Sequence, residues 1–221
     1  MNYSNIIYGR FIKRINRFTA EVSVNDAVKL VHVKNTGRCE QLLKEGAEIS
    51  LQKCDKPKRK TEFDLIAAHG EYGWVNIDST APNVVAGEWL RSQGFTLVRP
   101  EYRFGDSRID FYMERGSERY LMEVKGCTFR QGDIGYFPDA PTERGIKHLR
   151  ELSSAVALGY NAIAAYVIPM NGVKMVRPNT QIHPEYGKAL EAARNDGVKV
   201  LYLQCRSEAD SLCVINAEYA L

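Results

Sequence analysis

The chain has 221 residues, of which 44% are hydrophobic and 26% are charged. This composition is ordinary for a folded globular protein and excludes an intrinsically disordered or fibrous chain. No apolar run is long enough to span a membrane, and the first residues do not resemble a signal peptide. Five scattered cysteines without a Cys-x-x-Cys motif argue against a zinc knuckle or a disulfide framework, and they predict reduced thiols in the cytoplasm.

The net charge is only +3, but the charges are distributed unevenly along the chain. Residues 1–80 hold 13 Lys and Arg against 10 Asp and Glu, whereas residues 81–221 hold 17 of each kind. The whole basic excess therefore lies in the first third of the chain. Such clustering favours a nucleic acid as the partner of this part.

Residues 8–78 predict a succession of short β-strands with no long helical pattern. The predicted strands cover residues 8–16, 19–24, 27–33, 48–53, 62–69 and 73–77. Asn25 and Asp26 are a good pair for a tight turn between the second and third strands. Five or six strands in about seventy residues predict a small OB-like β-barrel over residues 1–80, an architecture that often binds nucleic acid.

Basic side chains gather at several places in this predicted barrel. The candidate nucleic-acid contacts are Arg10, Lys13, Arg14 and Arg17 near the first strand, Arg38 in a loop that contains Asn and Gly, and Lys56, Lys58, Arg59 and Lys60 around a proline. Cations in a groove neutralise phosphates, and an aromatic side chain such as Phe18 stacks on a base. Taken alone, the loop at residues 56–60 is equally typical of a solvated turn.

Residues 81–221 predict a different order of elements, α-β-β-β-α-β-α-β. The predicted helices cover residues 83–93, 142–157 and 184–195, and the predicted strands cover residues 95–104, a hairpin at 107–125, 162–168 and 198–205. Residues 129–141 are predicted to form a loop because they contain Gly132, Gly135 and Pro138. A mixed sheet flanked by helices is the core of restriction-endonuclease-like folds, so the predicted fold class is α+β or α/β.

The hairpin at residues 107–125 carries the candidate catalytic residues. Side chains alternate along a strand, so Ile109 and Phe111 are predicted to share one face and Asp110 to lie on the other. In the second strand Glu123 and Lys125 share a face. If the faces of the two strands coincide, Asp110, Glu123 and Lys125 converge at one place on the sheet.

These residue types suit metal-assisted phosphate chemistry. Two carboxylates held close together repel each other unless they share a proton or a divalent cation. Asp110 and Glu123 are therefore candidate ligands for Mg²⁺ or Mn²⁺, and Glu88 on the preceding helix is a candidate third carboxylate. Lys125 would orient a water molecule or stabilise charge on the phosphate. The spacing resembles the PD-(D/E)xK nuclease signature, with Ile109 in place of the proline, although a solvated ion pair and a surface glutamate are the alternative interpretations.

The helix predicted at residues 142–157 has a polar face that begins a few residues after the hairpin. Arg144, Lys147 and His148 lie on this face and are candidate contacts to a phosphate backbone. His148 as a general base is a second interpretation, and a solvated helix surface is a third.

Several segments of the sequence resemble the sugar fermentation stimulation protein A (SfsA) family. They are Asn35-Thr36-Gly37-Arg38, Pro57-Lys58-Arg59-Lys60-Thr61, Ser107-Arg108-Ile109-Asp110-Phe111, Glu123-Val124-Lys125 and, most distinctively, Gly135-Tyr136-Phe137-Pro138-Asp139-Ala140-Pro141-Thr142-Glu143-Arg144-Gly145 followed by Lys147-His148-Leu149. The resemblance spans nearly the whole chain. It implies an N-terminal OB-like domain, a nuclease-like C-terminal domain, DNA binding and a regulatory role in sugar use. It places the nuclease-type positions on Asp110, Glu123 and Lys125.

Two functions are consistent with these observations. The first is a divalent-metal-dependent DNA phosphodiesterase, and the second is a DNA-binding transcriptional regulator of sugar metabolism that retains the nuclease fold without turnover. Lys125 favours the first function, because a protein that only clamps DNA has no need of a lysine beside the carboxylates. RNA stays an alternative ligand, since OB-like grooves accept either kind of strand.

Overall fold

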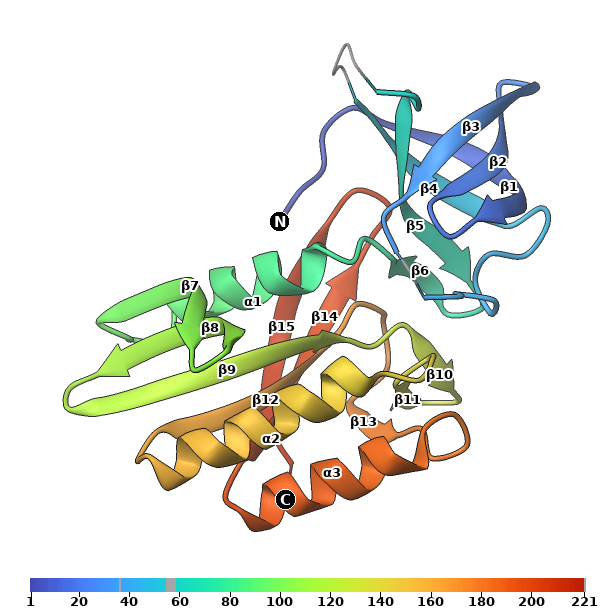
Figure 1. Cartoon of the computed structure of the whole chain (residues 1–221). Helices are drawn as coiled ribbons and strands as arrows, with labels where there is room; N and C mark the ends of the chain where they lie inside the picture. The colour runs from blue at the N-terminus through green and yellow to red at the C-terminus, as the bar shows by residue number, and fades with distance from the viewer. Residues whose placement is uncertain (36, 55–58, 221) are drawn as a thin grey trace.

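The computed structural model describes residues 1–35, 37–54 and 59–220. It consists of an N-terminal β-barrel and a C-terminal mixed sheet with helices on both faces (Figure 1). The predicted fold class is confirmed. Within the described ranges, no helix is both long and apolar enough to cross a membrane.

The N-terminal barrel is a six-stranded sheet in the order β3-β2-β1-β4-β5-β6. Its strands are β1 (Ile6–Asn16), β2 (Thr19–Val24), β3 (Ala27–Val33), β4 (Glu48–Lys53), β5 (Phe63–Gly70) and β6 (Gly73–Asn76). A parallel pairing of β3 with β5 closes the first five strands into a barrel. All six strands lie where the sequence predicts them, with small shifts at their ends.

Alternating residues fill the barrel interior. In β2 every second residue is buried, and Ala20, Val22 and Val24 belong to the core. The turn between β2 and β3 consists of Asn25 and Asp26, whose φ angles are 48° and 63°. A two-residue turn with positive φ matches the twist of a hairpin, so the predicted turn is confirmed.

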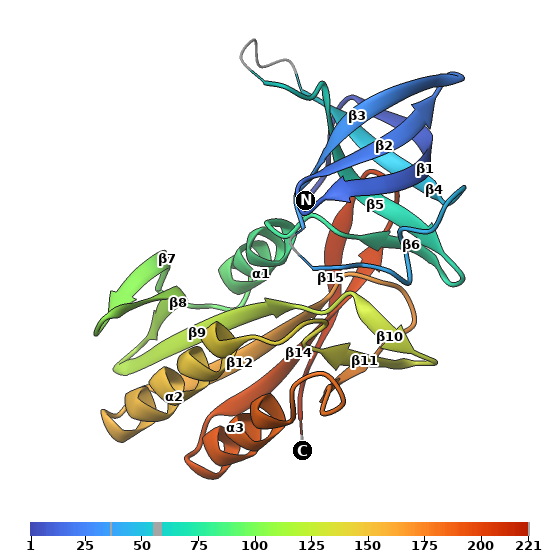
Figure 2. The same ribbon diagram turned by 45° about the vertical axis from the view of Figure 1, so that its right-hand side comes forward.

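The C-terminal domain is built on a mixed sheet in the order β15-β14-β12-β9-β8-β7. Its strands are β7 (Leu97–Phe104), β8 (Ser107–Arg115), β9 (Glu118–Gly126), β12 (Asn161–Ile168), β14 (Lys199–Ser207) and β15 (Leu212–Tyr219). β12 runs parallel to both β9 and β14. Helix α1 (Ala81–Arg91) lies on one face of the sheet, and α2 (Glu143–Ala157) and α3 (Pro184–Asn195) lie on the other (Figure 2).

Local signals set the ends of these helices. Thr142 caps α2 as predicted, because its hydroxyl accepts a hydrogen bond from the amide of Gly145 at 3.0 Å. Helix α3 has the predicted bounds. Helix α1 begins two residues earlier than predicted, because Pro82 suits the first turn of a helix, where its missing amide proton is not needed.

The segment at residues 129–141 is not the predicted loop. It contains β10 (Phe129–Gln131) and β11 (Ile134–Phe137), which form a small sheet with β13 (Met175–Pro178). β11 pairs in parallel with β13, which comes much later in the chain. Glycine and proline predict a loop locally, but pairing with a distant strand outweighs that preference. The strand β15 is also absent from the predicted elements.

One hydrophobic core runs through both domains. It contains barrel residues such as Leu65 together with residues of the C-terminal domain such as Leu149. Val75 of β6 and Met170 form an isolated β-bridge between the domains. The two domains therefore share both side-chain packing and backbone hydrogen bonding.

Because the core is shared, we expect the two domains to unfold in a single transition. The chain has two tryptophans, Trp74 in the barrel and Trp89 in α1. In the variants Trp74→Phe and Trp89→Phe the remaining tryptophan reports on one domain. Its urea midpoint should match that of the circular dichroism of the whole chain. Met170→Ala should lower the free energy of unfolding reported by both probes by the cost of a core cavity, roughly 2–5 kcal/mol. Separate fluorescence and dichroism midpoints would contradict the shared core.

Candidate functional site

The predicted hairpin is present, and its strands separate where the carboxylates lie. β8 and β9 pair from the turn as far as Phe111 opposite Met122. Beyond that pair, Asp110 Oδ2 accepts a hydrogen bond from the Val124 amide at 2.7 Å. Asp110 Oδ1 accepts a second one from the side chain of Asn83 in α1 at 2.8 Å. Asp110 therefore joins β8, β9 and α1.

The alternation of side chains along β8 breaks beside Asp110. Ile109 packs with Tyr112 in the core on the α2 side, whereas Phe111 packs in the core on the α1 side. The prediction that Ile109 and Phe111 share a face is therefore wrong. The neighbouring strand β7 is irregular at the same level, where Glu101 has a positive φ of 54°. Such irregularities redirect a side chain, and here Asp110 reaches the adjacent strand.

Glu123 is buried in the middle of the candidate site, with 4% of its surface exposed. Its Oε1 accepts a hydrogen bond from Lys125 Nζ at 2.6 Å and another from His148 Nδ1. Its Oε2 is also buried and has no hydrogen-bond partner among the described residues. Buried polar atoms without a partner are uncommon, and a carboxylate oxygen is the ligand that hard divalent cations prefer. Glu123 Oε2 therefore fits a Mg²⁺ or Mn²⁺ ion.

The side chains at this site fit a cation that keeps most of its water ligands better than a cation enclosed by protein ligands alone. In residues 1–35, 37–54 and 59–220, no three His, Cys, Asp or Glu side chains are grouped closely enough to hold a metal ion. Mg²⁺ usually keeps several waters and takes one or two protein carboxylates. Asp110 and Glu123 could supply these two carboxylates.

His148 lies on the buried side of α2 and not on the exposed polar face that the sequence predicts for it. It is 4% exposed and shares the buried face of α2 with Leu149. His148 Nε2 accepts a hydrogen bond from Arg144 Nε at 3.3 Å, so the ring proton on Nδ1 is directed to Glu123. These two hydrogen bonds satisfy the ring in its buried position. His148 is therefore buried and bonded to Glu123 and Arg144, and it does not lie on an exposed face of α2.

The two carboxylates have opposite electrostatic environments. Burial raises the pKa of Asp110, and the negative charge of Glu123 raises it further. Burial also acts to raise the pKa of Glu123, but His148 and Lys125 outweigh it and hold this pKa below its usual range. Glu123 is thus stabilised as an anion by its protein partners, whereas the anion of Asp110 lacks full compensation.

The structure does not bring Glu88 to this pair. Its Oε2 lies 2.8 Å from the N-terminal ammonium of Met1, and its side chain is 47% exposed. Asn83 of the same helix reaches Asp110 instead, because positions 83 and 88 differ by about 140° around an α-helix. Sequence reasoning missed Asn83, since an amide in the first turn of a helix belongs to no recognised motif. Its one signal is its place on the helix that precedes the hairpin.

Part of the predicted nucleic-acid surface forms a cleft on the barrel. Lys13, Arg17 and Arg38 line this cleft of about 810 Å³, together with two glutamates and Ala140 of the C-terminal domain. Arg14 also lines it, but the Arg14 guanidinium donates hydrogen bonds to five backbone carbonyl groups of the surrounding turn and loops. Arg14 therefore holds the cleft wall together, and the other three cations are better placed to meet a phosphate.

The remaining predicted nucleic-acid contacts that the structure describes lie apart from the lining of this cleft. Arg10 donates to the Gly46 carbonyl, Arg59 pairs with the buried Asp64, Lys147 lies 3.6 Å from Glu151, and Lys60 is exposed. Lys56 and Lys58 fall outside the described residues. All five cysteines are free thiols.

Comparisons with known proteins agree with this architecture. The family models described as "SfsA N-terminal OB domain" and "Sugar fermentation stimulation protein RE domain" match residues 12–77 and 80–211. A "Sugar fermentation stimulation protein homolog" of Desulfitobacterium hafniense is 44% identical over 96% of this chain and 94% of its own length. The homolog of Ruminiclostridium cellulolyticum is 44% identical over 93% of this chain and 92% of its own length.

A solved structure has the same fold. It is described as "The structure of Pyrococcus Furiosus SfsA in complex with Ca2+", and it superimposes with a TM-score of 0.86 at 23% identity. The match covers 98% of this chain and 96% of that chain. With both domains matched in order and close relatives along the whole length, the chain belongs to the sugar fermentation stimulation protein (SfsA) family.

Proposed function

We propose that the protein is a divalent-metal-dependent DNA phosphodiesterase. The observation that carries the proposal is the buried Oε2 of Glu123, which has no hydrogen-bond partner in the described part of the chain. Asp110 and Lys125 belong to the same cluster of side chains. The Pyrococcus furiosus relative is described as a complex with Ca²⁺, which supports a cation site in this family.

Each residue of the cluster has a role in this proposal. Asp110 and Glu123 hold Mg²⁺ or Mn²⁺, which when bound supplies positive charge at the phosphate and lowers the pKa of water. Lys125 donates a hydrogen bond to the attacking water or to the charge that develops on phosphate oxygen. His148 donates a hydrogen bond to Glu123 Oε1, which leaves Oε2 available to the cation. Arg144 fixes the ring of His148 in that orientation.

The barrel supplies the DNA-binding surface in this proposal. The cleft lined by Lys13, Arg17 and Arg38 reaches Ala140, which lies in the segment that leads into α2. Arg144 in the first turns of α2 contacts His148 beside Glu123. A DNA backbone that lies in the barrel cleft can therefore continue along this segment toward the carboxylates.

Metal binding depends on both carboxylates. Titration calorimetry with Mn²⁺ should give one binding event per chain for the wild-type protein. Asp110→Asn and Glu123→Gln should each weaken Mn²⁺ binding by at least about tenfold, because each replaces a charged carboxylate ligand by a neutral amide of similar shape. Glu88→Gln is the matched control and should bind Mn²⁺ like the wild type, since Glu88 pairs with the N-terminus. Equal affinities in all four proteins would place the cation elsewhere.

DNA binding depends on the cations of the barrel cleft. Counterion release predicts that the double variant Lys13→Gln/Arg17→Gln lowers the magnitude of the log–log salt slope by roughly one to two units, about one for each lost phosphate contact. The double variant Lys174→Gln/Lys188→Gln changes two exposed lysines outside the cleft lining and should keep the wild-type slope. The same slope in both double variants would move the DNA surface away from the barrel cleft.

A DNA-binding regulator without turnover is the second candidate function. It is favoured by one observation, that Lys125 is already bonded to Glu123 and lies 3.2 Å from His148 Nδ1. In such a protein the lysine serves as a structural partner of Glu123. The two functions differ in what Lys125 contributes to catalysis.

Lys125→Ala separates the two functions. If Lys125 acts in the transition state, DNA affinity should stay within a few-fold while cleavage falls by about a hundredfold or more. The measurement is single-turnover cleavage of single-stranded and double-stranded DNA, with RNA as a parallel substrate, in Mg²⁺, Mn²⁺ or chelator. Wild-type protein that binds DNA tightly and cuts none of these substrates with either metal would decide for the regulator.

A further inference from the structure

A second cleft lies on the α1 face of the C-terminal sheet, and its lining shares no residue with the candidate metal site. Its volume is about 750 Å³, within the range of small-molecule sites. Its walls come from the C-terminal end of α1, the turn region of the β8–β9 hairpin, and strands β14 and β15. Tyr120 lines the cleft and precedes Glu123 by three residues in β9, which corresponds to ~10 Å along a strand.

The lining of this cleft is aromatic and basic. The aromatic residues are Trp89, Phe95, Tyr120 and Tyr219, and the basic ones are Arg115, Arg194 and Lys199. No Asp or Glu is among the described residues that line it. The cleft is therefore electrostatically suited to an anion.

Arg115 is placed at the centre of the aromatic side chains. Its guanidinium carbon lies 4.4 Å from the centre of the Phe95 ring, and the Phe95 and Tyr120 rings meet edge to face at 5.2 Å. Burial raises the pKa of Tyr219, and the positive charge of Arg115 opposes that rise. The Tyr120 hydroxyl donates to Glu118 outside the lining. The Arg115 guanidinium thus lies over the face of Phe95 and donates to the Gln93 carbonyl, with the Tyr120 ring at the edge of Phe95.

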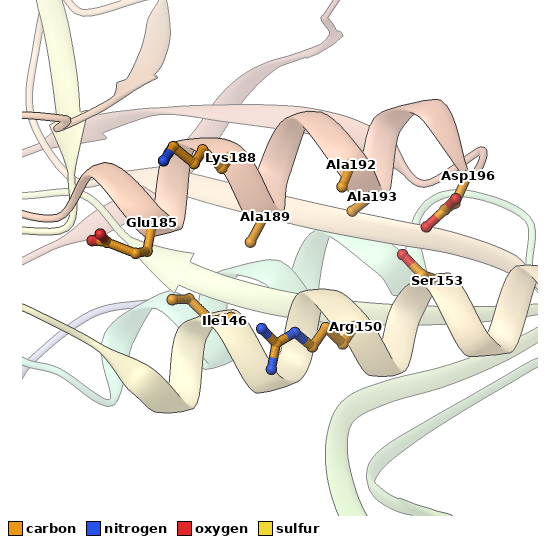
Figure 3. A pocket seen from close by; sticks show the side chains of 9 residues that line it. All are labelled: Ile146, Arg150, Ser153, Glu185, Lys188, Ala189, Ala192, Ala193 and Asp196. Atoms are coloured by element: carbon orange, nitrogen blue, oxygen red, sulfur yellow. The ribbon is translucent and has the colours of Figure 1, made fainter.

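Two other clefts lined by described residues lack this combination. The cleft between α2 and α3 has a volume of about 510 Å³, and its cations Arg150 and Lys188 are accompanied by Glu185 and Asp196 (Figure 3). Figure 3 shows these two carboxylates at opposite ends of a floor made mainly of alanines. The barrel cleft also includes glutamates in its lining. Cations and aromatic rings without carboxylates therefore distinguish the cleft on the α1 face.

We propose that this cleft binds a nucleotide, with the phosphate at Arg115 and Lys199 and the base against the aromatic rings. Guanidinium and ammonium groups form charge-assisted hydrogen bonds with phosphate. Aromatic side chains stack on any base, and a guanidinium can stack on the same ring system. The nucleotide is either free in solution or part of a strand, since both present the same phosphate and base. This site shares no residue with the candidate metal site and does not depend on cleavage there.

Trp89 provides a local probe of this cleft. In a Trp74→Phe background it is the sole tryptophan, so its fluorescence can be excited at the red edge, where bases do not absorb. A nucleoside monophosphate should cause a saturable change in this fluorescence. Arg115→Gln and Lys199→Gln should each weaken binding by about tenfold, the effect of losing one charge-assisted hydrogen bond. Lys174→Gln is the control and should bind like the parent.

Two further titrations distinguish the sources of the nucleotide. A short single-stranded oligonucleotide that binds more than about tenfold tighter than the monophosphate, and is weakened by Arg115→Gln, identifies a strand as the source. Equal affinities for both ligands identify a free nucleotide. Either result supports the proposal.

The proposal is overturned by any of three results. The first is no saturable change in Trp89 fluorescence with either ligand up to millimolar concentration. The second is a change of the same affinity in the parent, Arg115→Gln and Lys199→Gln proteins. The third is a change that follows protein concentration and coincides with dimer formation in sedimentation, which would make the cleft a contact between two copies of the chain. Urea unfolding of each variant confirms that it folds like the parent.

Discussion

The buried hydrogen bond between Glu123 and His148 joins the central strand β9 to helix α2, and the rest of the candidate site depends on it. A carboxylate taken out of water without a partner costs on the order of several kcal/mol, so Glu123 requires donors at this position. His148 comes from the helix and Lys125 from the strand, and both donate to the same oxygen. This arrangement fixes α2 against the sheet and stabilises the anion. Of the groups that the structure describes, only uncharged ones donate hydrogen bonds to Asp110, and the pKa of Asp110 is raised in the same surroundings.

The two domains meet along segments that are far apart in the sequence. Gly37 of the barrel lies against Asp139, and a Cβ atom at Gly37 would overlap the Asp139 carboxylate. A side chain larger than hydrogen would therefore have to displace the Asp139 carboxylate in the segment that precedes α2. Ala140 of that segment lines the barrel cleft, and Arg144 beyond it contacts His148. Close packing at Gly37 thus places the basic barrel surface and the carboxylate site on one connected path.

Elements with local signals could be predicted from the sequence, and elements that depend on distant partners could not. The Asn25–Asp26 turn, the Thr142 cap and the helix α3 follow from residue type and spacing alone. The strand β11 forms because β13 pairs with it, and no property of its own four residues predicts that partner. In the site, alternation predicts that Glu123 and Lys125 lie together, and they are hydrogen-bonded. It fails for Ile109 and Phe111, which lie on opposite faces, because the irregularity beside Glu101 is a property of the paired strands.

The same limit explains why His148 and Glu88 are placed differently from their predictions. A histidine beside Arg144 and Lys147 is typical of a solvated face, and only the buried carboxylate on a neighbouring strand gives it a partner in the interior. Glu88 has the residue type of a metal ligand, but the helix geometry directs Asn83 to Asp110 instead. These partners leave Glu123 with one oxygen saturated by protein donors and one buried oxygen without a donor in the described residues. Glu151 has the same asymmetry between its two oxygens, so the argument for Glu123 as a ligand rests on the unpartnered oxygen together with the neighbouring Asp110 and Lys125.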